Sequence, residues 1–304
     1  MAIKTRFVYH PDYLKYYFGP GHPFWPERAK RFLELLPGVL TEESYQVVKP
    51  RPATDKDILL VHSGEYLKRV KKIAADKGAL AVDTPLSPDI LRAAYVYTGG
   101  SILAASLALE GNLMINLLGG LHHAGISQAS GFCVFNDHAI AIRKLQKEGR
   151  IKKAFILDLD VHAGQGTQEI FYGDPEVFTV SLHQDPSTLY PGTGFPSQRG
   201  KEKGLGYNLN VIFPPGTGEE EYLTKMDETL PLICEFSPDL LMVVLGVDTF
   251  KEDPLASLGL TEDSYTKIGE RLKSLGYPKF FCFAGGYSSK VPQLWLNFMK
   301  GLTA

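Results

Sequence analysis

Short apolar runs recur along the chain and alternate with longer segments of helical periodicity. Five of these runs are rich in β-branched or aromatic residues, which is typical of strands: 113–118, 153–159, 177–182, 240–245 and 279–283. Apolar residues at helical spacing predict helices over 88–109, 134–148, 219–236 and 261–275, the first of which begins at a proline. Strands that alternate with helices predict a parallel central sheet with helices on both faces, a three-layer α/β/α fold.

Polar residues follow each predicted strand at the point where its apolar run ends. They are His122 and His123, Asp160 and His162, His183, Asp248, and Tyr287, several of them in segments that contain glycines. Sites in open α/β sheets form at the carboxyl ends of the strands. The pattern therefore predicts one functional site at that edge of the sheet.

Asp158, Asp160 and His162 alternate along an extended segment, which would place their side chains on one face. Burying two carboxylates is costly unless a cation neutralises them. Asp248 follows another apolar strand and would supply a third ligand, leaving an open position as in catalytic zinc sites. Ferrous iron, cobalt and manganese also accept these ligands, and the alternative to any metal is an Asp pair that caps the next helix or binds arginines.

The tandem pair His122–His123 is the candidate acid–base machinery. One imidazole can take a proton from the attacking water and return it to the leaving amine. Each ring needs an acceptor on its second nitrogen, and Asp158 and Gln165 are the candidates. Tyr287 is either a surface-turn tyrosine or a donor to the developing oxyanion. Phe132 and Tyr190 are either core aromatics or the lining of an apolar tunnel.

Composition narrows the class of protein. The chain has 304 residues and a formal net charge of −2, so no nucleic-acid or membrane partner is indicated. No linker divides it, which predicts one domain over 1–304. The three cysteines, Cys133, Cys234 and Cys282, form no CxxC pair, and we expect each to be a buried, inert thiol. No apolar run of membrane-span length is expected, and a cytoplasmic location is predicted.

Several longer stretches resemble the histone deacetylase family, which has the arginase–deacetylase fold and includes acetylpolyamine amidohydrolases and acetoin-utilisation proteins. They occur in the family's order and span most of the chain. They are HPFWPER (22–28), HSGEYL (62–67), DTPLSP (83–88), GGLHHAGISQASGFCVFND (119–137), DLDVHAGQGTQEIFY (158–172), VSLHQDPSTLYPGTGF (180–195), GYNLN (206–210), LGVDTFKEDP (245–254) and AGGY (284–287).

The resemblance implies a mostly parallel eight-stranded sheet and a deacetylase that hydrolyses the acyl-amide bond of acetyl-lysine or a similar acylated amine. One zinc ion would be bound by Asp160, His162 and Asp248. His123 would be the general base and acid, with Tyr287 stabilising the oxyanion. Substrate-binding positions would be Asp83 at the rim, Gly131, Phe132 and Tyr190 in the tunnel, and Gly286, with Arg28 behind the site.

The family resemblance also implies structural potassium. Asp158 and Ser181 match side-chain ligands near the zinc, and Asp160, His162 and Leu182 match backbone ligands. A second potassium ion would lie near Phe171, Asp174, Val177 and Tyr207.

Two positions depart from the family pattern. Gln165 stands where many members have aspartate or asparagine, and Ala163 replaces a common second histidine. A neutral amide stabilises an imidazolium less than a carboxylate does, so the basicity of His123 is expected to be lower. Three alternatives stay open: an acetylpolyamine or small-molecule deacylase, a non-catalytic module that binds an acylated ligand, and a two-manganese ureohydrolase. The last lacks its extra carboxylates, because those positions are Gly164, Thr249 and Phe250.

Overall fold

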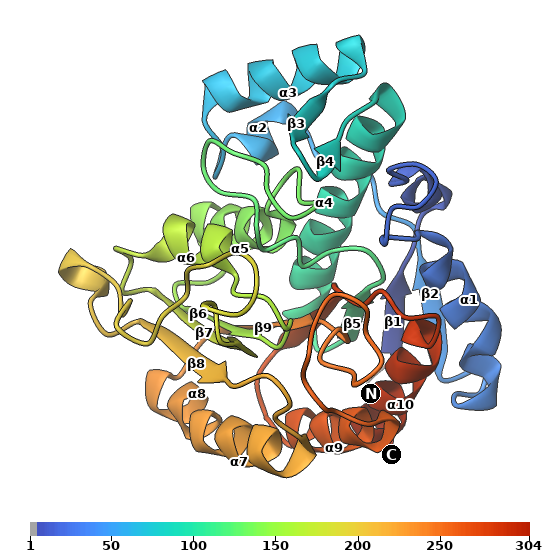
Figure 1. Ribbon diagram of the computed structural model, residues 1–304, viewed down its shortest axis with the longest axis vertical. Helices are drawn as coiled ribbons and strands as arrows, with labels where there is room; N and C mark the ends of the chain where they lie inside the picture. The colour runs from blue at the N-terminus through green and yellow to red at the C-terminus, as the bar shows by residue number, and fades with distance from the viewer. Residues whose placement is uncertain (1–4) are drawn as a thin grey trace.

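The computed structural model describes residues 5–304, which are arranged around one eight-stranded sheet (Figure 1). The strand order is β2-β1-β5-β10-β9-β6-β7-β8, and each neighbouring pair is parallel. The strands are β1 (Thr5–Val8), β2 (Tyr45–Val48), β5 (Leu113–Asn116), β6 (Ala154–Asp158), β7 (Val177–Gln184), β8 (Asn208–Phe213), β9 (Leu240–Leu245) and β10 (Lys279–Phe283). A separate antiparallel pair is formed by β3 (Ala79–Ala81) and β4 (Thr84–Pro85).

The central strands are buried on both faces, which explains their unbroken apolar runs. Every residue of β6 and β9 is buried. Because successive side chains point to opposite faces, β9 sends Leu241 and Val243 into one core cluster and Met242 and Val244 into another. The sheet thus separates two hydrophobic layers, as the α/β/α prediction required.

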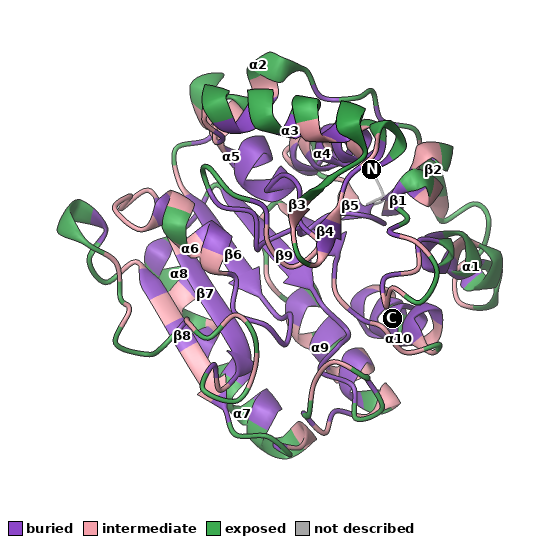
Figure 2. Cartoon of the chain, turned by 45° about the horizontal axis from the view of Figure 1, so that its top comes forward, coloured by how far each residue is buried: buried purple, intermediate pink, exposed green. Residues whose placement is uncertain are grey.

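Helices cover both faces. α1, α7, α8, α9 and α10 pack with the first cluster, and α4, α5 and α6 with the second. Figure 2 shows the buried sheet in the interior and exposed residues on the outer helices α2 and α3. The bounds are α1 (Glu27–Leu35), α2 (Asp55–Ile58), α3 (Gly64–Asp76), α4 (Pro88–Ala108), α5 (Asp137–Lys147), α6 (Gln165–Phe171), α7 (Glu219–Thr229), α8 (Pro231–Phe236), α9 (Glu262–Lys273) and α10 (Val291–Thr303).

All five predicted strands are present, and the predicted α/β fold with a mostly parallel eight-stranded sheet is confirmed. The single helix expected over 219–236 is wrong, because α7 ends at Thr229 and α8 begins at Pro231. Proline has no N–H to donate and favours the first turn of a helix, so it starts a new segment.

Two further expectations need correction. By length and composition α4 qualifies as a membrane span, with a mean hydropathy of 1.2, yet 61% of that window is buried inside the protein. It is the only such helix within residues 5–304, and its packing on α5 and the sheet identifies it as a core helix. Cys133 and Cys282 are buried as expected, but Cys234 is exposed, because α8 turns Ile233 and Phe236 inward instead.

The α1–α10 contact offers a test of the core. Trp295 is fully buried, stacked on Phe283 with ring centroids 4.6 Å apart and edge-on to Phe32 at 5.9 Å. Trp295→Ala is expected to lower the free energy of unfolding by about 3–5 kcal/mol, because it leaves a cavity between the sheet and two helices. Denaturant unfolding would measure this, and Leu205→Ala, at a side chain that is 66% exposed, is the matched control with a change within about 0.5 kcal/mol. An equal effect of both substitutions would contradict the assignment.

Candidate active site

The strand order brings the polar residues of four strands to one edge of the sheet. Asp158 ends β6 and lies beside Val244 of β9 and Ser181 of β7. β9 in turn pairs with β10, and β10 with β5. The connections that follow these strands therefore converge, and they carry the tandem histidines, Asp160, His162, Asp248 and Tyr287.

Asp160, His162 and Asp248 form a compact buried group whose ligand atoms all lie within 4.8 Å of one another. Their exposed fractions are 2%, 7% and 0%, so water does not solvate the negative charges of the two carboxylates. His162 Nδ1 lies 3.0 Å from Asp160 Oδ1 and 3.4 Å from Asp248 Oδ2. Two oxygens and one imidazole nitrogen make the donor set of a three-ligand metal site.

The electrostatics of this group call for a cation. Asp248 Oδ2 is buried and has no hydrogen-bond partner. Burial, followed by repulsion from Asp160, raises the pKa of Asp248 to about 7. Burial lowers the pKa of His162, but the carboxylates of Asp160 and Asp248 outweigh it and raise the pKa to about 10. Both shifts show that positive charge is stabilised at this point, so these three residues fit a metal ion.

Glycines and backbone amides hold the two carboxylates in place. Gly285 N–H donates to Asp160 Oδ2 at 3.0 Å, and Val161 N–H donates to Asp248 Oδ1 at 2.9 Å. A Cβ atom on Gly285 would lie 2.1 Å from Asp248 Oδ2 and 2.2 Å from Asp160 Oδ2. The backbone can therefore approach the carboxylates this closely only at a glycine.

The tandem histidines face each other, with their Nε2 atoms 3.1 Å apart. His122 Nδ1 contacts Asp158 Oδ2 at 2.6 Å, and His123 Nδ1 contacts Gln165 Oε1 at 2.6 Å. Burial lowers the pKa of His122, but Asp158 and Asp160 outweigh it and raise the pKa to about 9. Burial and the neighbouring imidazoles hold the pKa of His123 well below its usual value. The pair thus divides into a histidine that favours the charged form and one that favours the neutral form.

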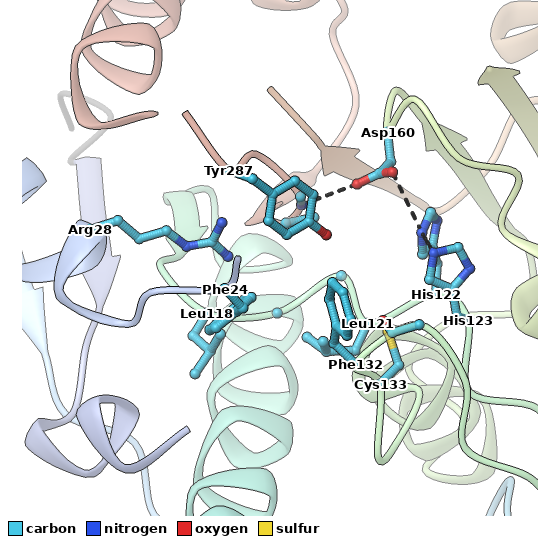
Figure 3. A pocket seen from close by; sticks show the side chains of 15 residues that line it. Phe24, Arg28, Leu118, Leu121, His122, His123, Phe132, Cys133, Asp160 and Tyr287 are labelled. Carbon is cyan, nitrogen blue, oxygen red and sulfur yellow. Dashed lines mark hydrogen bonds and ion pairs between the residues drawn. The ribbon is translucent and has the colours of Figure 1, made fainter. Parts of the chain in front are cut away.

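Hydrogen bonds to the backbone of Gly286 and Tyr287 hold the Tyr287 turn in place. Its N–H donates to Asp253 Oδ2 at 2.7 Å, and Arg28 Nη1 donates to the carbonyl of Gly286 at 2.8 Å. Figure 3 shows the phenol oxygen turned toward the side where Asp160 and the histidines lie. Burial, then repulsion from Asp160, raises the pKa of Tyr287 well above 10, so its oxygen keeps its proton and can donate it in a hydrogen bond.

Three residues expected to bind substrate lie close to His123 or Tyr287: Gly131, Phe132 and Tyr190. Gly131 has φ +52°, and a Cβ there would meet His123 Cδ2 at 2.2 Å. Phe132 and Tyr287 pack edge to face at 5.9 Å, as do Tyr190 and His123 at 5.1 Å. Asp83 Oδ2 accepts the N–H of Gly131 at 3.1 Å, which ties the β3–β4 hairpin to this wall.

A cavity lies among several of these groups. It is lined by the tandem histidines, Gly131, Phe132, Asp160 and Tyr287, and also by Arg28 and Phe24 (Figure 3). Gly286 does not line this cavity, and its carbonyl faces Arg28 instead.

The residues expected to hold potassium lie next to one another, and the ion itself stays a prediction. Asp158 and Ser181 are register partners on β6 and β7 and line one small polar cavity, and Leu182 follows in β7. At the second expected position, the Asp174 carboxylate binds Arg143 Nη1 at 2.5 Å. His183, although it follows the predicted run, stays outside the site, because its ring nitrogens contact Ser181 Oγ and the Gly194 carbonyl at 2.8 and 2.9 Å.

Comparison with known proteins identifies the family. Residues 22–302 match the histone deacetylase domain. The chain belongs to the histone deacetylase family. It is a histone deacetylase-like hydrolase.

Two curated relatives of this histone deacetylase domain cover most of it. A probable deacetylase of Archaeoglobus fulgidus is 37% identical over 277 residues, which cover 88% of this chain and 76% of the relative. The acetoin utilization protein AcuC of Bacillus subtilis is 32% identical over 318 residues, which cover 97% of this chain and 82% of the relative.

Two solved structures share the fold over nearly the whole domain. An acetylpolyamine aminohydrolase from Burkholderia pseudomallei has a TM-score of 0.87 and 27% identity, covering 99% of both chains. An HDAC homologue in complex with SAHA has a TM-score of 0.90 and 30% identity, covering 98% of this chain and 84% of that one.

Three supporting residues of this deacetylase domain were not anticipated from the sequence. Asp137, fully buried, accepts the N–H groups of Gly120 and Leu121 at 3.0 and 2.8 Å and so shapes the turn before the tandem histidines. Asp253 orients Tyr287, and Ser130 contacts Gln165 Nε2 at 3.2 Å. An acidic residue in the first turn of a buried helix was the available signal for Asp137. The sequence around Asp253 and Ser130 carries no comparable signal.

The glycine that faces both carboxylates generates a prediction. Gly285→Ala is expected to weaken metal binding by about 10–100-fold, since the added methyl group must displace Asp160 or Asp248. Metal content after dialysis against a zinc buffer would measure it. Gly276→Ala is the matched control, because its added Cβ meets no atom within 4 Å. Full zinc occupancy in Gly285→Ala would show that these carboxylates do not bind the ion.

Proposed function

We propose that the protein is a zinc-dependent deacetylase that hydrolyses the acyl-amide bond of acetyl-lysine or a similar acylated amine. The observation that carries the proposal is the buried Asp160–His162–Asp248 group, with its unpartnered carboxylate oxygen, beside a pair of histidines of opposite charge preference. The ligand set suits zinc, and the open fourth position is that of a catalytic zinc site.

The metal and the side chains have separate tasks. Asp160, His162 and Asp248 would hold the zinc ion, which would supply Lewis-acid chemistry for the amide carbonyl and lower the pKa of water. His123, neutral near pH 7, has an unprotonated Nε2 when Nδ1–H donates to Gln165, and this Nε2 lies 3.1 Å from His122 Nε2. Its Nε2 takes a proton from the attacking water and passes it to the departing amine nitrogen as the C–N bond breaks.

Tyr287 and His122 stabilise charge during this transfer. The phenol O–H of Tyr287 donates to the oxyanion that develops from the carbonyl oxygen. His122, paired with Asp158, keeps positive charge next to His123 and so limits how strongly His123 holds the proton.

The substrate arm would pass between the aromatic side chains. Phe132 lines the cavity and Tyr190 packs on His123, so the two rings would flank a passage that suits a thin aliphatic stem ending in an amide. Asp83 would bind the substrate backbone or a second amine at the rim. A potassium ion near Asp158, Ser181 and Leu182 would support the metal-binding turn from behind, and it belongs to the same proposal.

A small acylated amine is the second candidate substrate, supported by the 0.87 TM-score to an acetylpolyamine aminohydrolase. The deciding experiment is acetate release from an acetyl-lysine peptide and from acetylated polyamines, after chelation and again after zinc addition. Zinc-restored release would support the proposed reaction, and the preferred substrate would separate the two candidates. No release from any acyl amide by the zinc-loaded protein would favour the binding-module alternative.

Tyr287→Phe tests the oxyanion donor. We expect kcat to fall by about 100-fold or more, because the lost hydrogen bond forms only as charge develops. KM and zinc content should change little, since the ring stays and the hydroxyl is not a metal ligand. Near-normal turnover would remove Tyr287 from its assigned role.

The pH dependence tests the base. Because the pKa of His123 is held below its usual value, the acid limb of kcat/KM should lie below pH 6.5. Gln165→Glu places a carboxylate against His123 Nδ1, raises the pKa of the imidazole, and should move that limb upward by about one pH unit. Glu43→Gln, an exposed change before β2, is the control and should leave the limb in place. An unchanged limb in Gln165→Glu would show that His123 is not the titrating base.

A further inference from the structure

Gln165 poses a problem that a carboxylate in its place would not. Both oxygens of a carboxylate accept hydrogen bonds, whereas a side-chain amide has one accepting and one donating end. If the amide were turned around, its NH₂ would face His123 Nδ1, and that nitrogen would have to be unprotonated. The proton would then sit on Nε2, and His123 would have no lone pair facing the site.

Two hydroxyl groups meet the donating end of this amide. Gln165 Nε2 lies 3.2 Å from Ser130 Oγ and 3.5 Å from Tyr190 Oη, while Oε1 lies 2.6 Å from His123 Nδ1. The two hydroxyls also bond each other, so one can donate to the other while both oxygens face the NH₂ group. Ser130 and Gln165 are half-buried and Tyr190 is 42% exposed, so water competes least for the contact between Ser130 and Gln165.

We propose that Ser130 and Tyr190 are positioning residues that fix the amide of Gln165 with its oxygen toward His123, and so keep the proton of His123 on Nδ1. The expected effect of Ser130 and Tyr190 on turnover rests on the proposed deacetylase function. Their expected effect on the tautomer of His123 does not depend on any reaction.

The same arrangement gives Tyr190 two contacts with different consequences. Its ring packs edge-on to His123 at 5.1 Å and would border the proposed substrate passage, while its hydroxyl lies in the hydrogen-bond chain to the base. Tyr190→Phe removes only the second contact. A loss confined to kcat is then the signature of positioning, whereas a change in KM would report the tunnel wall.

The kinetic test is a double-mutant cycle with the zinc-loaded full chain and an acetyl-lysine peptide, at a pH above the acid limb. Tyr190→Phe and Ser130→Ala should each lower kcat about 5-fold and together about 30-fold, with KM nearly unchanged. In a Gln165→Glu background both oxygens can accept from His123, so the same substitutions should change kcat less than about 2-fold. Tyr45→Phe, on β2 at the far edge of the sheet, is the matched control and should have no effect. Equal losses in the wild-type and Gln165→Glu backgrounds would overturn the proposal.

The tautomer test uses histidine 15N chemical shifts of the metal-free protein, with the His123 signals assigned by their loss in His123→Gln. The wild-type protein should show a protonated Nδ1, and the Ser130→Ala, Tyr190→Phe double variant should show a mixture of both tautomers. An unchanged tautomer in a folded double variant would overturn the proposal. If the wild-type protein hydrolyses no acyl amide but the tautomer responds as expected, the proposed function fails and the positioning role stands.

Discussion

Two carboxylates buried at one point govern this structure. Asp160 and Asp248 are almost inaccessible to solvent, lie against the same imidazole, and have backbone amides rather than lysine or arginine as their other partners. Leaving two anionic groups so close in a dry interior is costly unless a cation joins them. The glycines of the surrounding turns let the backbone approach this negative charge, and the parallel strands present these turns at one edge of the sheet. Asp158, and then Asp160, set the charge preference of His122.

The parallel sheet supplies what the carboxylates require. Adjacent strands end at the same edge, so loops far apart in the chain meet there without long excursions. The hydrogen bonds of each loop are then completed by another: Asp137 accepts from the turn that carries the histidines, and Asp253 accepts from the turn that carries Tyr287. Rigid positioning of the reacting groups is thus a property of the loop cluster and not of any single motif.

The sequence predicted the parts of the site that are encoded locally. An apolar run followed by polar residues identifies a strand and its end, so Asp160, His162, Asp248 and the tandem histidines could be placed together from spacing alone. The roles given to Arg28 and Asp83 came only from family resemblance. Asp253 and Ser130 were missed because their contacts join segments 34 and 35 positions apart, which no local pattern reveals.

The fold shows the same division between local and distant information. The buried strands β6 and β9 were evident, whereas β2, half-exposed and only four residues long, has no distinctive pattern. Apolar spacing continued across Pro231 and concealed the break between α7 and α8. At Pro231 the missing backbone N–H predicts the break between the two helices, and the apolar spacing does not.

The hydrogen bond from Arg28 to Gly286 joins residues 258 positions apart. Nearby, Phe32 of α1 packs on Trp295 of α10, so segments near both ends of residues 5–304 contact each other. During synthesis the bond between Arg28 and Gly286 cannot form until almost the whole polypeptide has been made, and contacts of such long range slow folding. Loss of the segment around Arg28 would remove this bond beside Tyr287, although Asp160, His162 and Asp248 would all remain in the sequence.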